Sequence, residues 1–347
     1  MLRCLLSCPP VRLTLRSHVI RHSGRGYRAS CVKRNMSGES LLSKVRKPVK
    51  FRVCNVSSHP TELLEVHADY PKFHILFIPG NPGFISFYKD FLESLYDLLE
   101  GVASITAIAH ISHSRKDWED GRLFSLQEQI DHKVDFITHE LQKTEVPIVL
   151  VGHSIGAYIA IEILRRFRDK VIYCIALYPF LTLNPKSTWQ PIIEKISASS
   201  ILSTGLSFFV GLLGMLPKWA LRPIVLKFLG KSCSASAVEV ACSQLPKYYV
   251  SRNVLFMAMT EFRELSAPPD WTFLKENKDK ITFLFGSDDH WGPLQLLEEI
   301  SKQVPDIALS IEREGHTHNF SCTDAGSVWV ARHVASLLKS VIPTPET

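Results

Sequence analysis

In Ile148-Val149-Leu150-Val151-Gly152-His153-Ser154-Ile155-Gly156, a β-favouring aliphatic run leads directly into a Gly-x-Ser-x-Gly motif. The amphipathic pattern from Ala157 to Arg166 predicts a helix, so the motif joins a buried strand to a helix. Such a turn is sharp and strained, and it presents the serine hydroxyl at the edge of the sheet. We therefore interpret Ser154 as a nucleophile, the alternative being a serine that only caps the helix. A side chain at either flanking glycine is expected to collide with the neighbouring strand or helix.

Strand and helix patterns alternate on both sides of this motif. Strands are predicted at 50–56, 62–68, 73–78, 104–110, 171–178, 281–286 and 308–311, and helices at 85–99, 124–142, 294–304 and 327–340. The first two strands are expected to form a hairpin at the sheet edge. This order predicts an α/β fold with a mostly parallel central sheet, helices on both faces and right-handed crossovers.

The alternation lapses in the middle of the chain, which indicates an insertion. We expect a core formed by residues 46–180 and 281–347, with 181–280 as an apolar helical cap over the sheet edge where open α/β sheets bind ligands. A length of 347 residues suits one large α/β domain with an insertion, or two small domains.

The charge pattern argues against a nucleic-acid partner. The formal net charge is +6, but eight basic residues and no acidic residue lie in the first 38 positions, and the remainder is close to neutral. The eight cysteines are scattered and form no C-x-x-C pair, which favours free thiols in a reducing compartment. We therefore expect neither a disulfide framework nor a metal site.

Residues 1–45 are predicted to be an extension of the fold. They are rich in arginine, contain serine and have no acid before Glu39, which is the composition of a mitochondrial or plastid transit peptide. Met36 is a second possible start. Two interpretations stay open: a targeting segment, or an upstream stretch with no folded role.

A serine nucleophile needs a base and an acid, which in this fold follow it in the order Asp or Glu, then His. Asp289 comes just after the strand that ends at Gly286, with Asp288 as the fallback. His318 follows the last short strand and is the predicted base, with His316 second. We interpret three other histidines as structural, with no chemistry of their own: His110, His113 and His153.

Two backbone N–H groups are expected to form an oxyanion hole. One belongs to Ile155, which follows the nucleophile. The other lies in the loop Pro79-Gly80-Asn81-Pro82-Gly83, where Asn81 is the better donor because proline has no N–H. The alternative is that this loop is a simple turn rich in proline and glycine.

These motifs resemble the lipid droplet-associated hydrolase family of the α/β-hydrolase superfamily. The resemblance rests on Ile78-Pro79-Gly80-Asn81-Pro82-Gly83-Phe84, Phe87-Tyr88, the serine motif, Asp289-His290-Trp291-Gly292-Pro293 and His318-Asn319-Phe320. It covers roughly Phe73 to the C-terminus. It implies an α/β-hydrolase fold, a Ser154–Asp289–His318 triad, action at lipid droplets and the endoplasmic reticulum, and sterol esters or acylglycerols as substrates. His290 departs from the family pattern, which usually has proline after the acid.

The insertion contains an uncharged stretch from Ser197 to Leu216, followed by Pro217-Lys218-Trp219. As one helix of twenty residues it would reach about 30 Å, the thickness of a bilayer core. A span crossing the membrane would separate the acid and base from the nucleophile, which leaves two interpretations. It is either a buried lid helix or a helix–turn–helix that enters a lipid monolayer. The residues predicted to meet substrate or lipid are Phe208, Phe209, Leu212 and Trp219.

The sequence therefore predicts a serine ester hydrolase without cofactor that acts on lipid esters at the lipid droplet or endoplasmic reticulum surface. Its expected partners are the lipid ester substrate and a lipid monolayer or membrane surface. Two alternatives remain: a lipid-droplet surface or tethering protein with little turnover, and an esterase carried to a mitochondrion or plastid by residues 1–45.

Overall fold

The computed structural model describes residues 49–142, 145–230 and 232–342. The predictions for residues 1–45, including the targeting segment, lie outside the described residues.

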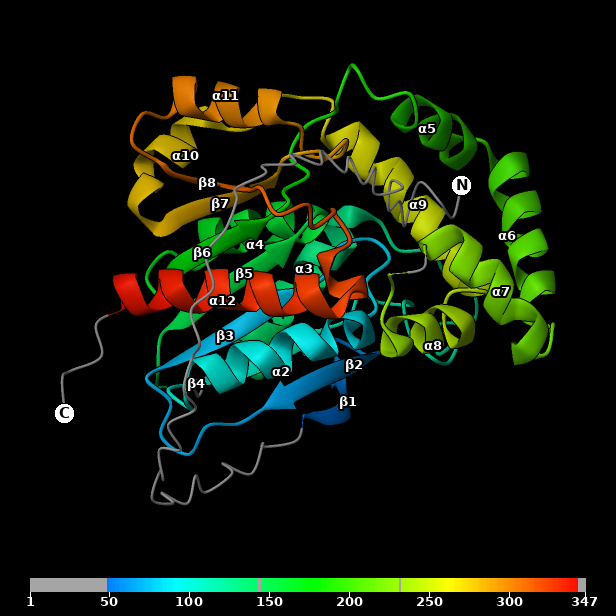
Figure 1. The fold of residues 1–347 in the computed structure, drawn as a ribbon, viewed down its shortest axis with the longest axis horizontal. Helices are drawn as coiled ribbons and strands as arrows, with labels where there is room; N and C mark the ends of the chain where they lie inside the picture. The colour runs from blue at the N-terminus through cyan, green and yellow to red at the C-terminus, as the bar shows by residue number, and fades with distance from the viewer. Residues whose placement is uncertain (1–48, 143–144, 231, 343–347) are drawn as a thin grey trace, which may run out of the picture.

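Within the described residues, eight strands form a single sheet in the order β1-β2-β4-β3-β5-β6-β7-β8 (Figure 1). β2 runs antiparallel to both of its neighbours, and every pairing from β4 to β8 is parallel. β1 and β2 form the predicted hairpin at the sheet edge. The strands are β1 (Lys50–Val56), β2 (His59–Val66), β3 (Phe73–Ile78), β4 (Ala103–Ile108), β5 (Ile148–His153), β6 (Val171–Leu177), β7 (Ile281–Gly286) and β8 (Ala308–Glu312).

The central strands are buried on both sides because helices cover both faces of the sheet, as the continuous apolar runs predict. In β3 and β5 every residue is buried, and successive side chains enter opposite hydrophobic cores. One core is closed by α2 (Lys89–Leu98) and α12 (Asp324–Val341), which lie side by side in Figure 1. The opposite core is closed by α3 (Leu126–His139), α4 (Ile155–Arg166), α10 (Trp271–Glu276) and α11 (Leu294–Gln303).

The helices begin and end where local chemistry allows. The predicted helix at 85–99 begins as a 3-10 turn, η1 (Ile85–Tyr88), before α2. α3 begins at a capping box in which Ser125 and Glu128 satisfy each other's backbone N–H groups. α12 follows the short η3 (Phe320–Cys322), and the Thr323 hydroxyl accepts the Gly326 N–H over 3.1 Å.

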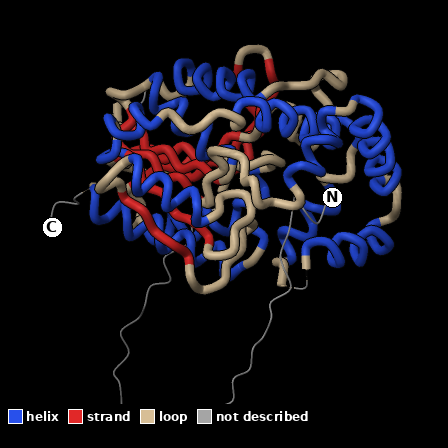
Figure 2. Tube along the Cα trace, turned by 90° about the horizontal axis from the view of Figure 1, so that it is seen from above, coloured by secondary structure: helices blue, strands red, loops and turns tan. Residues whose placement is uncertain are grey.

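The stretch between β6 and β7 is helical and, apart from α10, it forms a region of helices beside the strand-bearing part of the molecule (Figure 2). α9 lies between the sheet and α6 (Figure 1), and it contributes side chains to the cavity at the ends of the strands. The helices of this stretch, besides α10 and the short η2 (Lys278–Lys280), are α5 (Gln190–Ala198), α6 (Ser200–Gly214), α7 (Lys218–Leu229), α8 (Ala235–Ser243) and α9 (Tyr248–Glu264).

The uncharged stretch is not one helix. α5 ends at Ala198 and α6 begins at Ser200, with a bend of 99° between them. Ser199 causes the new start, since its hydroxyl accepts the Leu202 N–H and caps α6. Within the described residues no single helix has the length and apolar composition to cross a membrane, although α5 and α6 together pass that test as a bent pair.

α6 exposes most of its large apolar side chains, whereas Val210 and two of its hydroxyl groups are buried. Ser203 and Ser207 are buried, and Arg252 on α9 donates to the Ser203 hydroxyl over 2.7 Å. The interpretation of this stretch as a buried lid helix is therefore wrong. The outward side chains, with Trp219 at the start of α7, form an apolar rim made of Ile201, Leu202, Phe208, Phe209, Leu212, Met215, Leu216 and Trp219.

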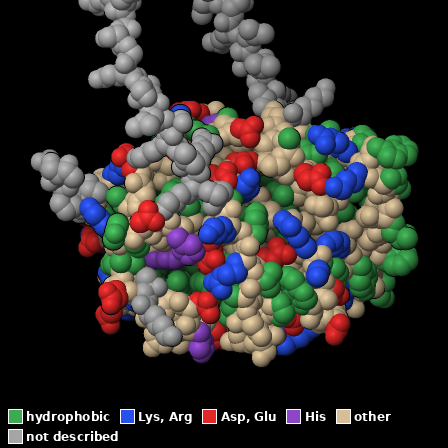
Figure 3. Space-filling view, turned by 90° about the horizontal axis from the view of Figure 1, so that it is seen from below, with side chains coloured by type: hydrophobic (Ala, Val, Ile, Leu, Met, Phe, Trp, Pro, Cys, Tyr) green, Lys and Arg blue, Asp and Glu red, His purple; other side chains and the backbone are tan. Residues whose placement is uncertain are grey.

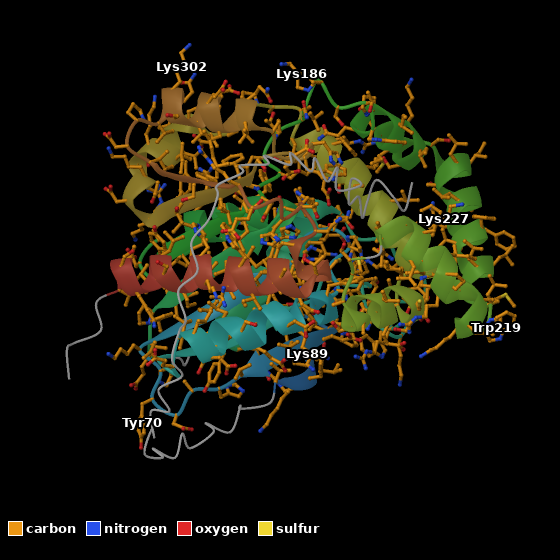
Figure 4. The ribbon with its side chains drawn as sticks, viewed as in Figure 1. Tyr70, Lys89, Lys186, Trp219, Lys227 and Lys302 are labelled. Atoms are coloured by element: carbon orange, nitrogen blue, oxygen red, sulfur yellow. The ribbon has the colours of Figure 1, made fainter. Side chains whose placement is uncertain are left out.

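The apolar rim lies at the right-hand end of the molecule in Figure 1, opposite the C-terminal end of α12. Hydrophobic side chains gather at the right-hand edge of Figure 3, the side on which α6 and α7 lie in Figure 1. Trp219 projects from this side and Tyr70 from the opposite one (Figure 4). No acidic residue occurs between Lys195 and Glu239, and Lys218 forms an ion pair with Glu239 itself, which leaves the exposed Arg222 and Lys227 as the basic border of the rim.

Candidate active site

Ser154 stands at the strained turn between β5 and α4 that the sequence predicts. Its backbone has φ 57° and ψ −124°, a conformation unfavourable for a residue with a side chain. The flanking glycines make the turn sterically possible. A Cβ at Gly152 would lie 2.2 Å from the Gly156 oxygen, and one at Gly156 would lie 2.3 Å from the Ile78 oxygen. The Ser154 hydroxyl does not cap α4, so the capping interpretation is wrong.

The structure brings together the three predicted triad residues from three loops at the same edge of the sheet. Ser154 Oγ lies 2.9 Å from His318 Nε2, and His318 Nδ1 lies 2.8 Å from Asp289 Oδ2. With an ionised Asp289 carboxylate, Nδ1–H donates to Asp289 and Nε2 is left to accept the serine proton. All three side chains are more than 90% buried. This is the geometry that activates a serine for attack on an acyl carbon.

The fallback residues lie outside this chain of hydrogen bonds. Asp288 is exposed, whereas Asp289 is fixed by a second bond in which the Trp291 N–H donates to Oδ1 over 2.9 Å. His316 packs its ring against Trp329 with 5.8 Å between ring centroids. His290 stands where the family usually has proline, and the Asp289 carboxylate beside it still bonds to His318 and to the Trp291 N–H.

Tyr88 and His153 form a directed chain of hydrogen bonds behind the nucleophile. The Gly80 N–H donates to the Tyr88 hydroxyl over 3.2 Å, and that hydroxyl donates to His153 Nδ1 over 2.7 Å. His153 Nε2–H donates to the backbone oxygen of His318 over 2.9 Å. Burial, together with the nearby His318, lowers the pKa of His153 well below its usual value, so the neutral ring can accept at one nitrogen and donate at the other.

The two predicted oxyanion donors lie at this site with free N–H groups. Neither the Asn81 nor the Ile155 backbone N–H has an acceptor within the described part of the chain. Gly80 cannot serve in their place, because Tyr88 already takes its N–H. Asn81 and Ser154 both line the cavity beside the triad. An N–H pair of this kind can bind the negative oxygen of a tetrahedral intermediate.

The loop that carries Asn81 rests on buried histidines, as the structural interpretation of His110 and His113 expects. The Gly83 N–H donates to His113 Nδ1 over 2.8 Å, and a Cβ at Gly83 would lie 2.3 Å from the His110 ring. Burial lowers the pKa of His113 to about 3, with the buried Lys133 adding to the shift. The His113 ring is therefore neutral near pH 7 and can accept this hydrogen bond.

The cavity beside Ser154 is small and partly open, and α9 forms one of its walls. Its volume is about 40 Å³, space for about three water molecules. Its apolar wall is formed by Phe180, Trp291 and Phe262, and Glu261 of α9 adds a carboxyl group to the lining.

Sequence reasoning missed Tyr88 and Glu261. Tyr88 was part of the motif carrying the resemblance, but no spacing rule connects it to His153. Glu261 does leave a signal, since it interrupts the apolar face that α9 forms with Val254, Ala258 and Phe262. A carboxyl group on the buried face of an amphipathic helix indicates a specific partner.

Phe208, Phe209, Leu212 and Trp219 are not part of the cavity. They lie on the apolar rim, with 60%, 57%, 47% and 80% of their surface exposed. The residues predicted to meet substrate or lipid are thus separate from the site of the triad.

Comparisons with known proteins agree with the fold and the motifs. A sequence model described as lipid-droplet associated hydrolase matches residues 71–321. The lipid droplet-associated hydrolase of Gallus gallus is 27% identical over 270 residues, which cover 72% of this chain and 80% of the relative. Among solved structures, a haloalkane dehalogenase from Agrobacterium tumefaciens C58 aligns with a TM-score of 0.64 and 12% identity. The alignment covers 85% of this chain and 97% of the dehalogenase. An epoxide hydrolase from Vigna radiata aligns with a TM-score of 0.60 and 15% identity, over 85% of this chain and 99% of the epoxide hydrolase.

The structural likeness confirms the α/β-hydrolase fold, and the sequence match extends from the loop before β3 to η3. The chain therefore belongs to the lipid droplet-associated hydrolase family.

Proposed function

We propose that this hydrolase is a serine ester hydrolase that acts on lipid esters. The observation that carries the proposal is the continuous set of hydrogen bonds from Ser154 through His318 to Asp289. Ser154 attacks the ester carbonyl while His318 Nε2 takes its proton, and Asp289 holds the imidazole in the required orientation. His318 then protonates the leaving alcohol, and water cleaves the acyl-enzyme by the reverse sequence of proton transfers.

In this mechanism the Asn81 and Ile155 N–H groups bind the oxyanion as it develops. The loss of one such donor lowers kcat by about 10²–10³ fold in other serine hydrolases. All of these groups belong to the protein, so the proposed reaction requires no cofactor.

The proposed substrates are sterol esters or acylglycerols at the surface of a lipid droplet or the endoplasmic reticulum. Two observations support a lipid surface: the names of the relatives, and the exposed apolar rim with its basic border. Exposed aromatic and aliphatic side chains bordered by lysine and arginine suit a helix pair that rests in a monolayer.

The test is hydrolysis by the purified protein of emulsified triacylglycerol, monoacylglycerol and cholesteryl oleate, with Ser154→Ala as the control. We expect fatty acid release from at least one emulsion, and its loss in the variant. Equal release by both proteins, or none from any lipid or short-chain ester, would overturn the proposal.

The apolar rim also favours a second candidate, a lipid-surface or tethering protein with little turnover. Under this candidate, binding to droplets persists in Ser154→Ala and no ester is cleaved. A third candidate, delivery of an esterase to a mitochondrion or plastid, depends on residues 1–45. Fusion of those residues to a fluorescent reporter tests it, and a diffuse cytosolic signal would remove it.

A further inference from the structure

Glu261 lies on the buried face of α9, where it meets the loop that carries the proposed oxyanion donor. The residue is 4% exposed, and its neighbours along this face are Val254, Ala258 and Phe262. Glu261 lines the same cavity as Ser154 and His318. A buried carboxyl group in apolar surroundings is costly unless a specific partner compensates for the lost water.

The partner of Glu261 is the side chain of Asn81. Asn81 Nδ2 donates to Glu261 Oε1 over 2.9 Å and to the Val254 backbone oxygen over 3.0 Å. An amide nitrogen has two hydrogens, so both are used and both acceptors belong to α9. The side chain of Asn81 is thereby fixed to the cap helix, while its backbone N–H stays free beside Ser154.

We propose that Glu261 is a positioning residue for the oxyanion site, and that its carboxyl group must be protonated for full activity. This inference rests on the proposed ester hydrolase function. Glu261 acts through Asn81, since a shift of the loop displaces the N–H that must meet the developing oxyanion. An error of about 1 Å in such a position can cost about 10² fold in rate.

The protonated form is the one present at neutral pH. Burial raises the pKa of Glu261 to about 8, with the hydrogen bond from Asn81 acting in the opposite direction, and no charged side chain contributes to the shift. Above this pKa an uncompensated negative charge stands in the cavity where the oxyanion forms, which opposes the reaction.

The titratable groups around Glu261 come from several elements. Those that line the cavity with it are Tyr88, His153, His318 and Cys322, with Asp289 behind His318. The helices that pack against α9 carry Glu128, Asp131, His132, Lys133, Asp135 and His139 on α3 and Glu194 and Lys195 on α5, whereas α6 has no ionisable side chain.

The test compares wild type with Glu261→Gln and Glu261→Ala, using a fluorophosphonate probe for Ser154 labelling and a short-chain p-nitrophenyl ester for kcat and KM. If ionisation of Glu261 stops the reaction, wild-type labelling falls by about tenfold between pH 7 and pH 9, as one group with a pKa near 8 requires. E261Q keeps the hydrogen-bond acceptor and cannot ionise. We expect it to match wild type at pH 7 within threefold and to lose much less activity at pH 9.

Glu261→Ala removes the acceptor, and we expect kcat to fall by about tenfold or more with KM within about twofold of wild type. Asn81→Ala should give a similar loss, and the double variant should lose no more than either single one, because both act through one contact. Glu264→Gln is the matched control. Glu264 lies on α9 three residues further along, is exposed, and bonds to Tyr158 away from the cavity.

Several outcomes separate the two proposals. If wild type is never labelled, the proposed function fails. If wild type is labelled but E261Q shows the same alkaline loss as wild type, and Glu261→Ala reacts at the wild-type rate, the role of Glu261 is overturned. Should Glu261→Ala fail to fold, the pH profile of E261Q decides.

Discussion

His153 Nε2 and the backbone oxygen of His318 lie 2.9 Å apart, so the turn that carries the nucleophile is bonded directly to the loop that carries the base. This contact is separate from the Ser154–His318 side-chain bond. Tyr88 continues it to the Gly80 N–H beside the oxyanion loop. The nucleophile turn, the loop of His318 and the oxyanion loop are therefore joined by one chain of neutral hydrogen bonds.

We predict that Tyr88→Phe breaks this chain. The substitution leaves the Gly80 N–H and His153 Nδ1 buried without a partner, which is expected to cost about 1–3 kcal/mol of unfolding free energy. We expect Ser154 to react with a fluorophosphonate about threefold to thirtyfold more slowly, because the loops are less well aligned. Urea unfolding and labelling rates measure both effects.

Tyr96→Phe is the matched control for Tyr88→Phe. Tyr96 is also buried and lies on α2, but its hydroxyl donates over 3.4 Å to the His67 oxygen, and Tyr96 does not line the cavity beside Ser154. Slower labelling in both variants, or in neither, would contradict a specific role for Tyr88.

The apolar rim predicts a loss of lipid binding without a loss of stability. Phe208 and Trp219 are 60% and 80% exposed, so Phe208→Ser with Trp219→Ser should change the unfolding free energy by less than about 0.5 kcal/mol. Burial of each aromatic ring in lipid is worth about 1 kcal/mol or more, so droplet or vesicle affinity should fall by about tenfold or more. Flotation with triacylglycerol emulsions measures this.

Tyr70→Ser is the control for the rim variant, since Tyr70 is 91% exposed and projects from the opposite side of the molecule (Figure 4). An equal loss of binding in Tyr70→Ser, or unchanged flotation of the rim variant, would show that α6 and α7 are not the lipid-facing surface.

The two glycine environments predict opposite results for the same substitution. Gly156→Ala places a Cβ 2.3 Å from the Ile78 oxygen, and we expect a loss of about 3 kcal/mol or more, or failure to fold. Gly205→Ala meets nothing within 4 Å on the exposed middle of α6, and should stabilise the protein by about 0.5–1 kcal/mol. Thermal and urea unfolding measure both changes. An equal change in the unfolding free energy of the two variants would contradict the steric requirement for glycine at the turn.

Buried neutral histidines predict a loss of stability in acid. Burial lowers the pKa of His74 to about 4 and that of His113 to about 3, from an ordinary value near 6.5. The unfolded chain therefore binds more protons between pH 6.5 and these values. The contribution of these two rings to stability is complete above pH 6.5 and falls with acidification, by about 1.4 kcal/mol per pH unit for each ring.

Urea unfolding at pH 7.5, 6.5 and 5.5 measures the slope of unfolding free energy against pH. His74→Asn should reduce this slope by the contribution of one histidine ring. An identical slope in the variant would contradict the assignment. Glu261 has the opposite sign in an overlapping range, because its raised pKa makes its contribution to stability fall as pH rises from about 4.5 towards about 8. Glu261→Gln should remove that fall.

Much of the core could be predicted because its pattern is local. The continuous apolar run of β3 needs two covered faces, and the glycines around Ser154 are required by contacts of their own backbone. Asp289 and His318 could be chosen because the ends of parallel strands meet at one edge, so sequence order implies proximity.

The cap could not be predicted in the same way, because its arrangement depends on contacts between distant residues. Composition alone left open whether Ser197 to Leu216 forms one helix or a helix–turn–helix, and the position of the break at Ser199 depends on its cap of α6. The inward direction of Ser203 depends on Arg252, a partner 49 positions away. The bond between Asn81 and Glu261 joins residues 180 positions apart, and no motif connects them.

The most direct test of the central claim is labelling of the purified protein with a fluorophosphonate, followed by peptide mass spectrometry. The account predicts one modified residue, Ser154, with labelling abolished in Ser154→Ala and slowed by about 10³ fold or more in His318→Gln. Labelling at another serine, or an unchanged rate in a correctly folded His318→Gln, would contradict it.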